Sequence, residues 1–149
     1  MCMVVYKASD APHPLVPWNE RYPSFHVQEL DEVGEGVRKQ FFKPYVYYVG
    51  AHEGCGCGFS YGQHLSVDKE DEKDLVAARE SVRQLSDYLA NAVRDGVTIE
   101  LYACWSGDEK ETPEHRAWLK PGQIGGETFW FEERQLAVIG LEDGSWNGA

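Results

Sequence analysis

The chain has 149 residues, a length typical of one domain, and it carries 25 acidic against 14 basic residues for a net charge of −11. A surface this negative repels phosphate backbones and anionic membrane leaflets, so nucleic acid and membranes are excluded as expected partners. A basic protein or a cation fits this field, as does solubility alone.

The first forty residues predict two strands, a loop and a short helix. Residues 2–8 alternate in side-chain character as a strand does. Residues 9–17 contain three prolines within six residues, which excludes a helix interior or a central strand. A second strand is expected at 24–30, and a short helix frayed by two glycines at 31–40.

Residues 43–49 form the clearest predicted strand. Both faces of this segment are apolar or aromatic, and its last five residues form an unbroken row of tyrosines and valines. A strand of this composition is typical of the interior of a sheet, where both faces are covered. It leads directly into a glycine- and cysteine-rich segment.

Residues 68–94 are expected to form one long helix. Apolar residues recur at alternating steps of three and four and form a single stripe: Leu75, Ala78, Val82, Leu85, Leu89 and Ala92. Asp68 is placed to cap the amino end, and Gly96 is placed to end the helix in the left-handed conformation. We expect the leucines and Val82 of this stripe to be buried.

The last third of the chain predicts further strands. Residues 97–105 alternate between two faces, and Cys104 shares its face with Tyr102. A short helix is predicted at 112–118, because Thr112 can cap it and a proline follows at its first position. The remaining predictions are strands at 128–131 and 135–141 and a loose tail at 143–149.

These elements together predict an α+β fold. The expected architecture is a mixed or antiparallel sheet of about five strands with one long amphipathic helix packed on one face. Strands lie on both sides of a single helix in the sequence instead of alternating with many helices, which favours α+β over α/β. No repeat or linker divides the chain, so residues 1–149 are expected to form one domain.

The four cysteines are expected to be reduced thiols in a cytoplasmic protein. The apolar run at the start of the chain is shorter than the core of a signal peptide, and nothing approaches the roughly 18 apolar residues of a membrane span. Disulfides are rare in proteins that stay inside the cell. A domain of this size also needs neither disulfides nor a structural metal to fold.

The cysteine-rich segment is the candidate site. Cys55 and Cys57 are separated by one glycine, and His52 lies three residues before the first of them. Thiolate and imidazole are ligands for zinc, and thiolates also bind copper(I). A turn at the intervening glycine would bring both sulfurs onto one ion, with Cys104 or His64 as a fourth ligand. Cys104 can join only if the segment crosses the Tyr102/Cys104 face of its strand.

The sequence is compatible with three functions. The first is binding of a soft metal ion through Cys55, Cys57 and His52. The second is a thiol-dependent enzyme, with Cys55 or Cys57 activated by a histidine or by exposed amides. The third is a binding or interaction protein in which the cysteines only pack, as small apolar residues of a bulged strand. Its acidic surface or an aromatic pocket would then meet a protein partner or a small ligand.

An amino-terminal nucleophile is a further hypothesis, with less support than the three above. Cys2 directly follows Met1, as in enzymes that expose an amino-terminal nucleophile, but the strand at 2–8 is expected to bury its side chain. The chain has no phosphate-binding loop, dinucleotide fingerprint or nucleophile elbow.

Overall fold

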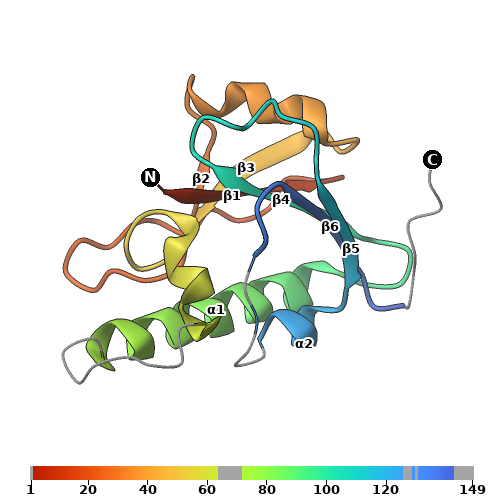
Figure 1. The fold of residues 1–149 in the computed structure, drawn as a ribbon. Coiled ribbons are helices and arrows are strands. Elements are labelled where there is room, and N and C mark those ends of the chain that lie inside the picture. The colour runs from red at the N-terminus through yellow and green to blue at the C-terminus, as the bar shows by residue number, and fades with distance from the viewer. Residues whose placement is uncertain (1, 64–71, 126–128, 130, 143–149) are drawn as a thin grey trace.

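A computed structural model describes residues 2–63, 72–125, 129 and 131–142 (Figure 1). Six strands form one open sheet in the order β2-β3-β1-β4-β6-β5. The strands are β1 Met3–Ser9, β2 His26–Glu29, β3 Tyr45–Gly50, β4 Ile99–Trp105, β5 His115–Leu119 and β6 Gln135–Ile139. All neighbours pair antiparallel except β5 and β6, which are parallel, so the sheet is mixed.

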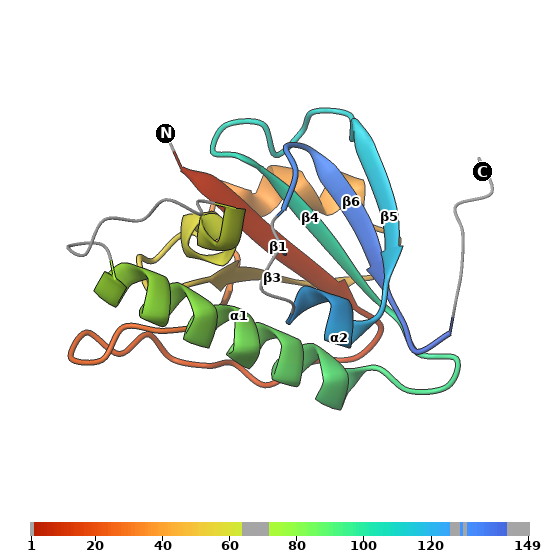
Figure 2. The ribbon, with the colours of Figure 1, turned by 60° about the horizontal axis from the view of Figure 1, so that its bottom comes forward.

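Helices lie on both faces of this sheet. The long helix α1 (Glu72–Ala92) crosses one face, with the short α2 (Pro121–Ile124) beside it (Figures 1 and 2). The 3-10 helix η1 (Gly34–Gln40) lies against the opposite face, and a second 3-10 helix, η2 (Gly56–Gln63), packs against α1. This arrangement confirms the predicted α+β fold with one long helix on one face of a mixed sheet.

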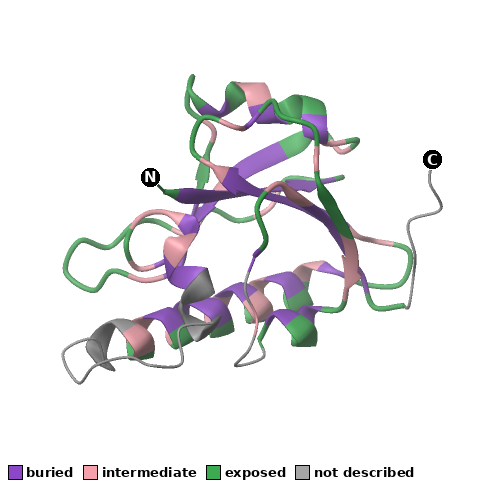
Figure 3. Cartoon of the chain, viewed as in Figure 1, coloured by how far each residue is buried: buried purple, intermediate pink, exposed green. Residues whose placement is uncertain are grey.

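The sheet separates two apolar cores. Val5, Leu101 and Ala103 face α1, whereas Val4, Tyr102 and Cys104 face the side of η1. The alternation predicted for 97–105 is therefore confirmed in β4. β1 lies between β3 and β4, and all seven of its residues are buried (Figure 3). The predicted interior position of 43–49 is confirmed as well, because β3 pairs with β2 on one side and β1 on the other.

Helix α1 buries its predicted stripe against the first core. Val82, Leu85 and Leu89 are buried as expected. Leu75 was also expected to be buried but is only half-buried. It lies one turn before Ala78, where the buried part of the stripe begins. The expected cap, Asp68, lies outside the described residues. Gly96 does have a positive φ of 75°.

The role of Gly96 differs from the prediction. The helix ends at Ala92, and the backbone groups of Arg94 and Val97 then exchange two hydrogen bonds. Gly96 therefore supplies the left-handed residue of a tight turn after the helix, where glycine has no steric penalty.

The predicted helix at 112–118 is wrong, because His115–Leu119 is strand β5. The amides of Glu114 and His115 donate to the carbonyl oxygen of Arg134, and β5 continues from there as the parallel partner of β6. A helix of two turns is marginal alone, whereas the edge of β6 offers unpaired backbone groups along its length.

The remaining differences concern short elements. Residues 31–40 contain a 3-10 helix instead of a frayed α-helix, and α2 was not predicted. The predicted strand 128–131 falls partly outside the described residues, and Phe129 and Phe131 lie outside any strand. No described helix has the length and apolar character needed to cross a membrane.

Lys7, in the central strand β1, is fully buried. Its Nζ lies 2.8 Å from His13 Nδ1 and 4.2 Å and 5.0 Å from the ring centroids of Tyr47 and Tyr88. Burial lowers the pKa of Lys7 to about 7, and burial together with the Lys7 charge lowers the pKa of His13 to about 4. Within the described residues no carboxylate pairs with Lys7, so aromatic rings and a neutral imidazole hold its ammonium.

Lys7 predicts a rise in stability with pH. The unfolded chain keeps the Lys7 proton up to a pKa of about 10.4, whereas the folded chain releases it above pH 7. The free energy of unfolding therefore increases between these values. Relative to Lys7→Met, the natural protein should gain up to about 3 kcal/mol from pH 7 to pH 9.5, measured by urea unfolding. Parallel stability curves for the two proteins would show that Lys7 titrates normally.

The contact between α1 and the sheet is tested by Leu85→Ala. This truncation should lower the free energy of unfolding by about 2–5 kcal/mol, because it removes buried apolar surface and leaves a cavity. Val76→Ala, at an exposed position of the same helix, is the matched control and should change it by no more than about 0.5 kcal/mol. Equal effects of the two substitutions would mean that the buried face of α1 is misassigned.

Candidate metal centre at the amino end of β1

The chain turns sharply where β3 ends. The amide of Ala51 donates to the Cys55 carbonyl at 2.9 Å, and the amide of Gly54 donates to the Ala51 carbonyl at 3.0 Å. Gly54 has a φ of 90°, which an L side chain rarely adopts. The hydroxyl of Tyr48 donates to the Gly54 carbonyl at 2.5 Å and fixes the turn against β3.

The segment after this turn lies close against β1. A Cβ atom on Gly56 would stand 2.7 Å from Val5 Cγ2, so only glycine fits between the segment and the strand. Three residues later, Phe59 is fully buried in the core beneath α1, and Cys57 packs against the same core. The cysteines are therefore held in η2 and the turn before it, not in the bulged strand that the packing hypothesis assumed.

Three thiols converge at this place. The sulfur atoms of Cys2, Cys55 and Cys57 all lie within 4.8 Å of one another. Cys2 is exposed and immediately precedes β1, whereas Cys55 and Cys57 are half-buried. We call these three residues the thiol cluster. Among the described residues, this is the one group of histidines, cysteines and carboxylates close enough to hold a metal ion.

The backbone contributes hydrogen bonds to the sulfurs. The amide of Met3, the first residue of β1, donates to Cys57 Sγ at 3.2 Å. The pKa of the Cys55 thiol is raised to about 12, mainly by burial and also by the neighbouring thiols of Cys57 and Cys2. A backbone hydrogen bond from Cys57 acts in the opposite direction and favours the Cys55 thiolate. Cys55 is therefore a protonated thiol at neutral pH unless a cation replaces its proton.

Within the described residues, His52 is not a member of the thiol cluster. Its amide donates to Ser81 Oγ of α1 at 3.2 Å, and its Nε2 lies 3.9 Å from Glu53 Oε1. The side chain is only 8% exposed. The second histidine considered for this site, His64, lies outside the described residues.

Cys104 lies on the other side of the sheet. It is fully buried with Val4 and Tyr102, whereas η2 packs on the α1 side. Cys104 was expected to be a metal ligand only if the cysteine segment crossed the Tyr102 face of β4. The segment lies on the opposite face. Burial, with a contribution from Glu109 and Asp108, raises the pKa of Cys104 to about 12.

Cys2 is the member of the thiol cluster that was not expected at this site. It was expected to be buried in the first strand, but the strand begins one residue later, and Cys2 is exposed. Its carbonyl accepts a hydrogen bond of 2.8 Å from the Ser106 amide, which ties it to the end of β4. A cysteine beside a predicted strand gives no sign of which loop that strand will meet, so only the pairing of β1 with β3 reveals this contact.

Comparisons with protein-family models, with curated proteins and with solved structures found no match to this chain. The function is therefore inferred from the geometry of the site.

The exposures predict an order of thiol reactivity. In the folded protein, Cys2 should be alkylated first and Cys104 last, at least about 100-fold more slowly, because exposing a core residue requires an opening that costs several kcal/mol. All four cysteines should react in denaturant without reductant. Mass spectrometry of peptides after timed alkylation measures both quantities. Rapid labelling of Cys104 in the folded protein, or a missing thiol in denaturant, would contradict the arrangement.

Proposed function

We propose that this protein binds a soft metal ion, zinc or copper(I), through Cys2, Cys55 and Cys57. The observation that carries the proposal is the convergence of three sulfurs within 4.8 Å, from two segments more than fifty residues apart. Thiolates are the ligands that select zinc and copper(I) over harder cations.

The spacing of the sulfurs suits one shared ion. With a sulfur–zinc distance of about 2.3 Å, two sulfurs on one tetrahedral ion lie about 3.8 Å apart. Sulfurs within 4.8 Å reach this separation by small rotations of their side chains. Cys2 precedes the strand and is exposed, so its side chain has room to adjust.

The surroundings also support binding of a cation. The Met3 amide donates to Cys57 Sγ, and outer hydrogen bonds of this kind orient metal ligands. The net charge of −11 attracts cations to the surface. For zinc, three protein sulfurs leave a fourth position for water, which is the arrangement of an open site. Copper(I) is the alternative that the same soft sulfurs would hold.

The thiol-enzyme hypothesis gains less support from the same geometry. A nucleophilic cysteine needs a lowered pKa, whereas the pKa of Cys55 is raised. No described histidine belongs to the thiol cluster. We further propose that the chain acts as one domain in the cytoplasm, where a reducing environment keeps the three thiols available to a metal.

Metal binding is tested on protein purified without chelator. We expect one equivalent of zinc or copper per chain by elemental analysis. Replacing any one of Cys2, Cys55 or Cys57 by serine should weaken binding by more than about 100-fold, since even the loss of an outer-shell partner costs 10–100-fold. Cobalt(II) substitution reports the number of sulfur ligands, because the charge-transfer absorption grows with each thiolate.

Two matched variants test whether Cys104 and His52, the other ligands expected from the sequence, take part in binding. Cys104→Ala and His52→Ala should retain full binding, because neither residue belongs to the thiol cluster. Affinity should rise with pH in the natural protein, since binding must release at least the Cys55 proton. A protein that binds no zinc or copper(I), or that binds equally after the loss of Cys55 and Cys57, would refute the proposal and favour cysteines that only pack.

A further inference from the structure

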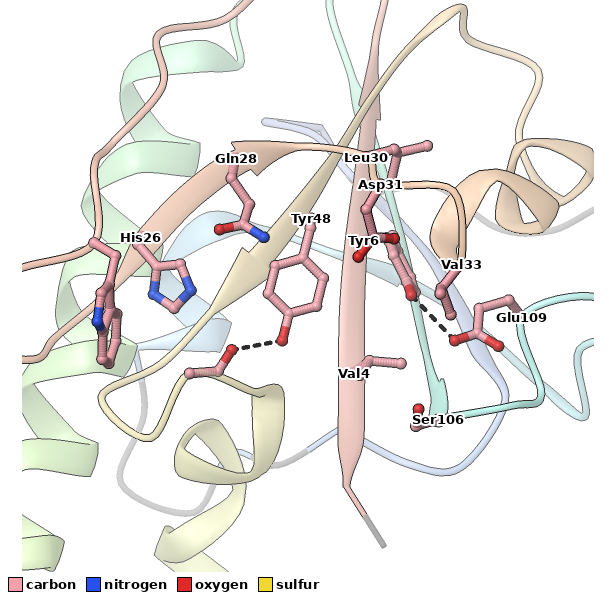
Figure 4. Close-up of a pocket in the computed structure, with 12 residues that line it drawn as sticks. Val4, Tyr6, His26, Gln28, Leu30, Asp31, Val33, Tyr48, Ser106 and Glu109 are labelled. Carbon is pink, nitrogen blue, oxygen red and sulfur yellow. Dashed lines mark hydrogen bonds between the residues drawn. The ribbon is translucent and has the colours of Figure 1, made fainter.

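A second concave site lies on the sheet face opposite α1. It has a volume of about 440 Å³, within the range of small-molecule pockets, and opens between β2, η1 and the loop that follows β4 (Figure 4). It touches the turn at Gly54, but none of the three cysteines of the thiol cluster lines it. The residues that would bind a ligand here are therefore distinct from the proposed metal ligands.

Three aromatic rings and one imidazole line the pocket. The ring of Tyr48 stands in the middle, with the centroid of Tyr6 at 5.7 Å and that of His26 at 6.1 Å (Figure 4). The Trp18 ring lies 4.8 Å from His26 and is 39% exposed. The pocket thus presents aromatic surface to a ligand and keeps part of it open to solvent.

Two carboxylates lie on the Tyr6 side of the pocket (Figure 4). Glu109 is only 6% exposed, and its oxygens accept hydrogen bonds from the Tyr6 hydroxyl at 3.1 Å and the Gly107 amide at 3.0 Å. Asp31 accepts from the Gly34 amide at 2.8 Å. Every one of these donors is neutral. In the part of the chain that the structure describes, no lysine, arginine or histidine forms an ion pair with either carboxylate.

Among the described residues that line the pocket, His26 is the one basic group. Burial lowers the pKa of its imidazole, which is therefore neutral at physiological pH. A buried carboxylate without a counter-charge is costly, and a positively charged ligand would supply one. Aromatic faces add attraction for the same sign of charge.

We propose that this pocket binds a small organic cation, a protonated amine with an apolar or aromatic body. The ammonium group would lie near Glu109 and Asp31, and the body would lie along Tyr48 toward His26 and Trp18. A divalent metal ion suits this site less well, because aromatic and aliphatic side chains make up most of the remaining wall.

The proposal is tested with ligands that share one shape and differ in charge. Phenethylamine, 2-phenylethanol and 3-phenylpropionate are titrated against Cys55→Ser/Cys57→Ser protein, which removes the proposed metal site. Methyl resonances of Val4, Leu30 and Val33 report the pocket, and those of Leu89 on the other face are the reference. We expect shifts of the pocket methyls with a dissociation constant of about 1 mM or tighter for the amine, as its few heavy atoms allow. The alcohol should bind at least about tenfold more weakly, and the carboxylate should not bind.

Variants identify the group that recognises the charge. Glu109→Gln retains a hydrogen-bond acceptor for Tyr6 and should weaken amine binding at least about tenfold. Glu35→Gln, an exposed carboxylate of η1 outside the pocket, is the matched control and should leave it unchanged. Equal binding of amine and alcohol, unchanged binding in Glu109→Gln, or shifts caused by magnesium or calcium but not by the amine would overturn the proposal. None of these outcomes bears on metal binding by the thiol cluster.

Discussion

The hydrogen bond from the Met3 amide to Cys57 Sγ joins the central strand of the sheet to the cysteine segment. β1 and β3 stay paired as far as Val5 and Val49, and beyond that pair the chain after β3 turns away. The thiol of Cys57 then takes the place of a strand partner for Met3. Because β1 is buried along its whole length, it cannot shift its register without breaking both cores. This rigid position places Cys2 beside Cys55 and Cys57.

The sheet keeps its two candidate sites apart. On one face, α1 packs over the core, and η2 together with the turn before it brings two cysteines to the end of β1. On the other face, η1 lies over one part of the sheet (Figure 1), and the aromatic pocket lies beside it (Figure 4). Tyr48 connects the two sites, since its ring lines the pocket and its hydroxyl holds the turn before Cys55. A ligand that moves Tyr48 would therefore act directly on the backbone next to the thiol cluster.

The parts of the fold with a strong local pattern were predictable from sequence. The stripe of α1, the alternation of β4 and the two covered faces of β3 all have short periods, and burial follows from them. The strand β5 was not predictable, because its pairing with β6 overrides a proline and threonine that favour a helix start. The glycines around Cys55 let the backbone turn at Gly54 and lie close against β1 at Gly56.

The membership of the thiol cluster depended on tertiary structure in a similar way. Cys55 and Cys57 are neighbours in sequence, so their proximity was expected. Cys2 joins them only because β1 lies next to β3, and strand order cannot be read from the sequence of either strand. Cys104 was excluded by tertiary structure as well. Side-chain alternation in β4 predicted the face of Cys104, but it did not predict the face on which the cysteine segment lies.

We propose that three sulfurs from the two ends of this contact hold one ion, and X-ray absorption spectroscopy of the zinc-loaded protein can count them. Three sulfur scatterers are expected at about 2.3 Å, falling to two in Cys2→Ser. A first shell made only of nitrogen and oxygen, or a sulfur count that does not change when Cys2 is replaced, would contradict it.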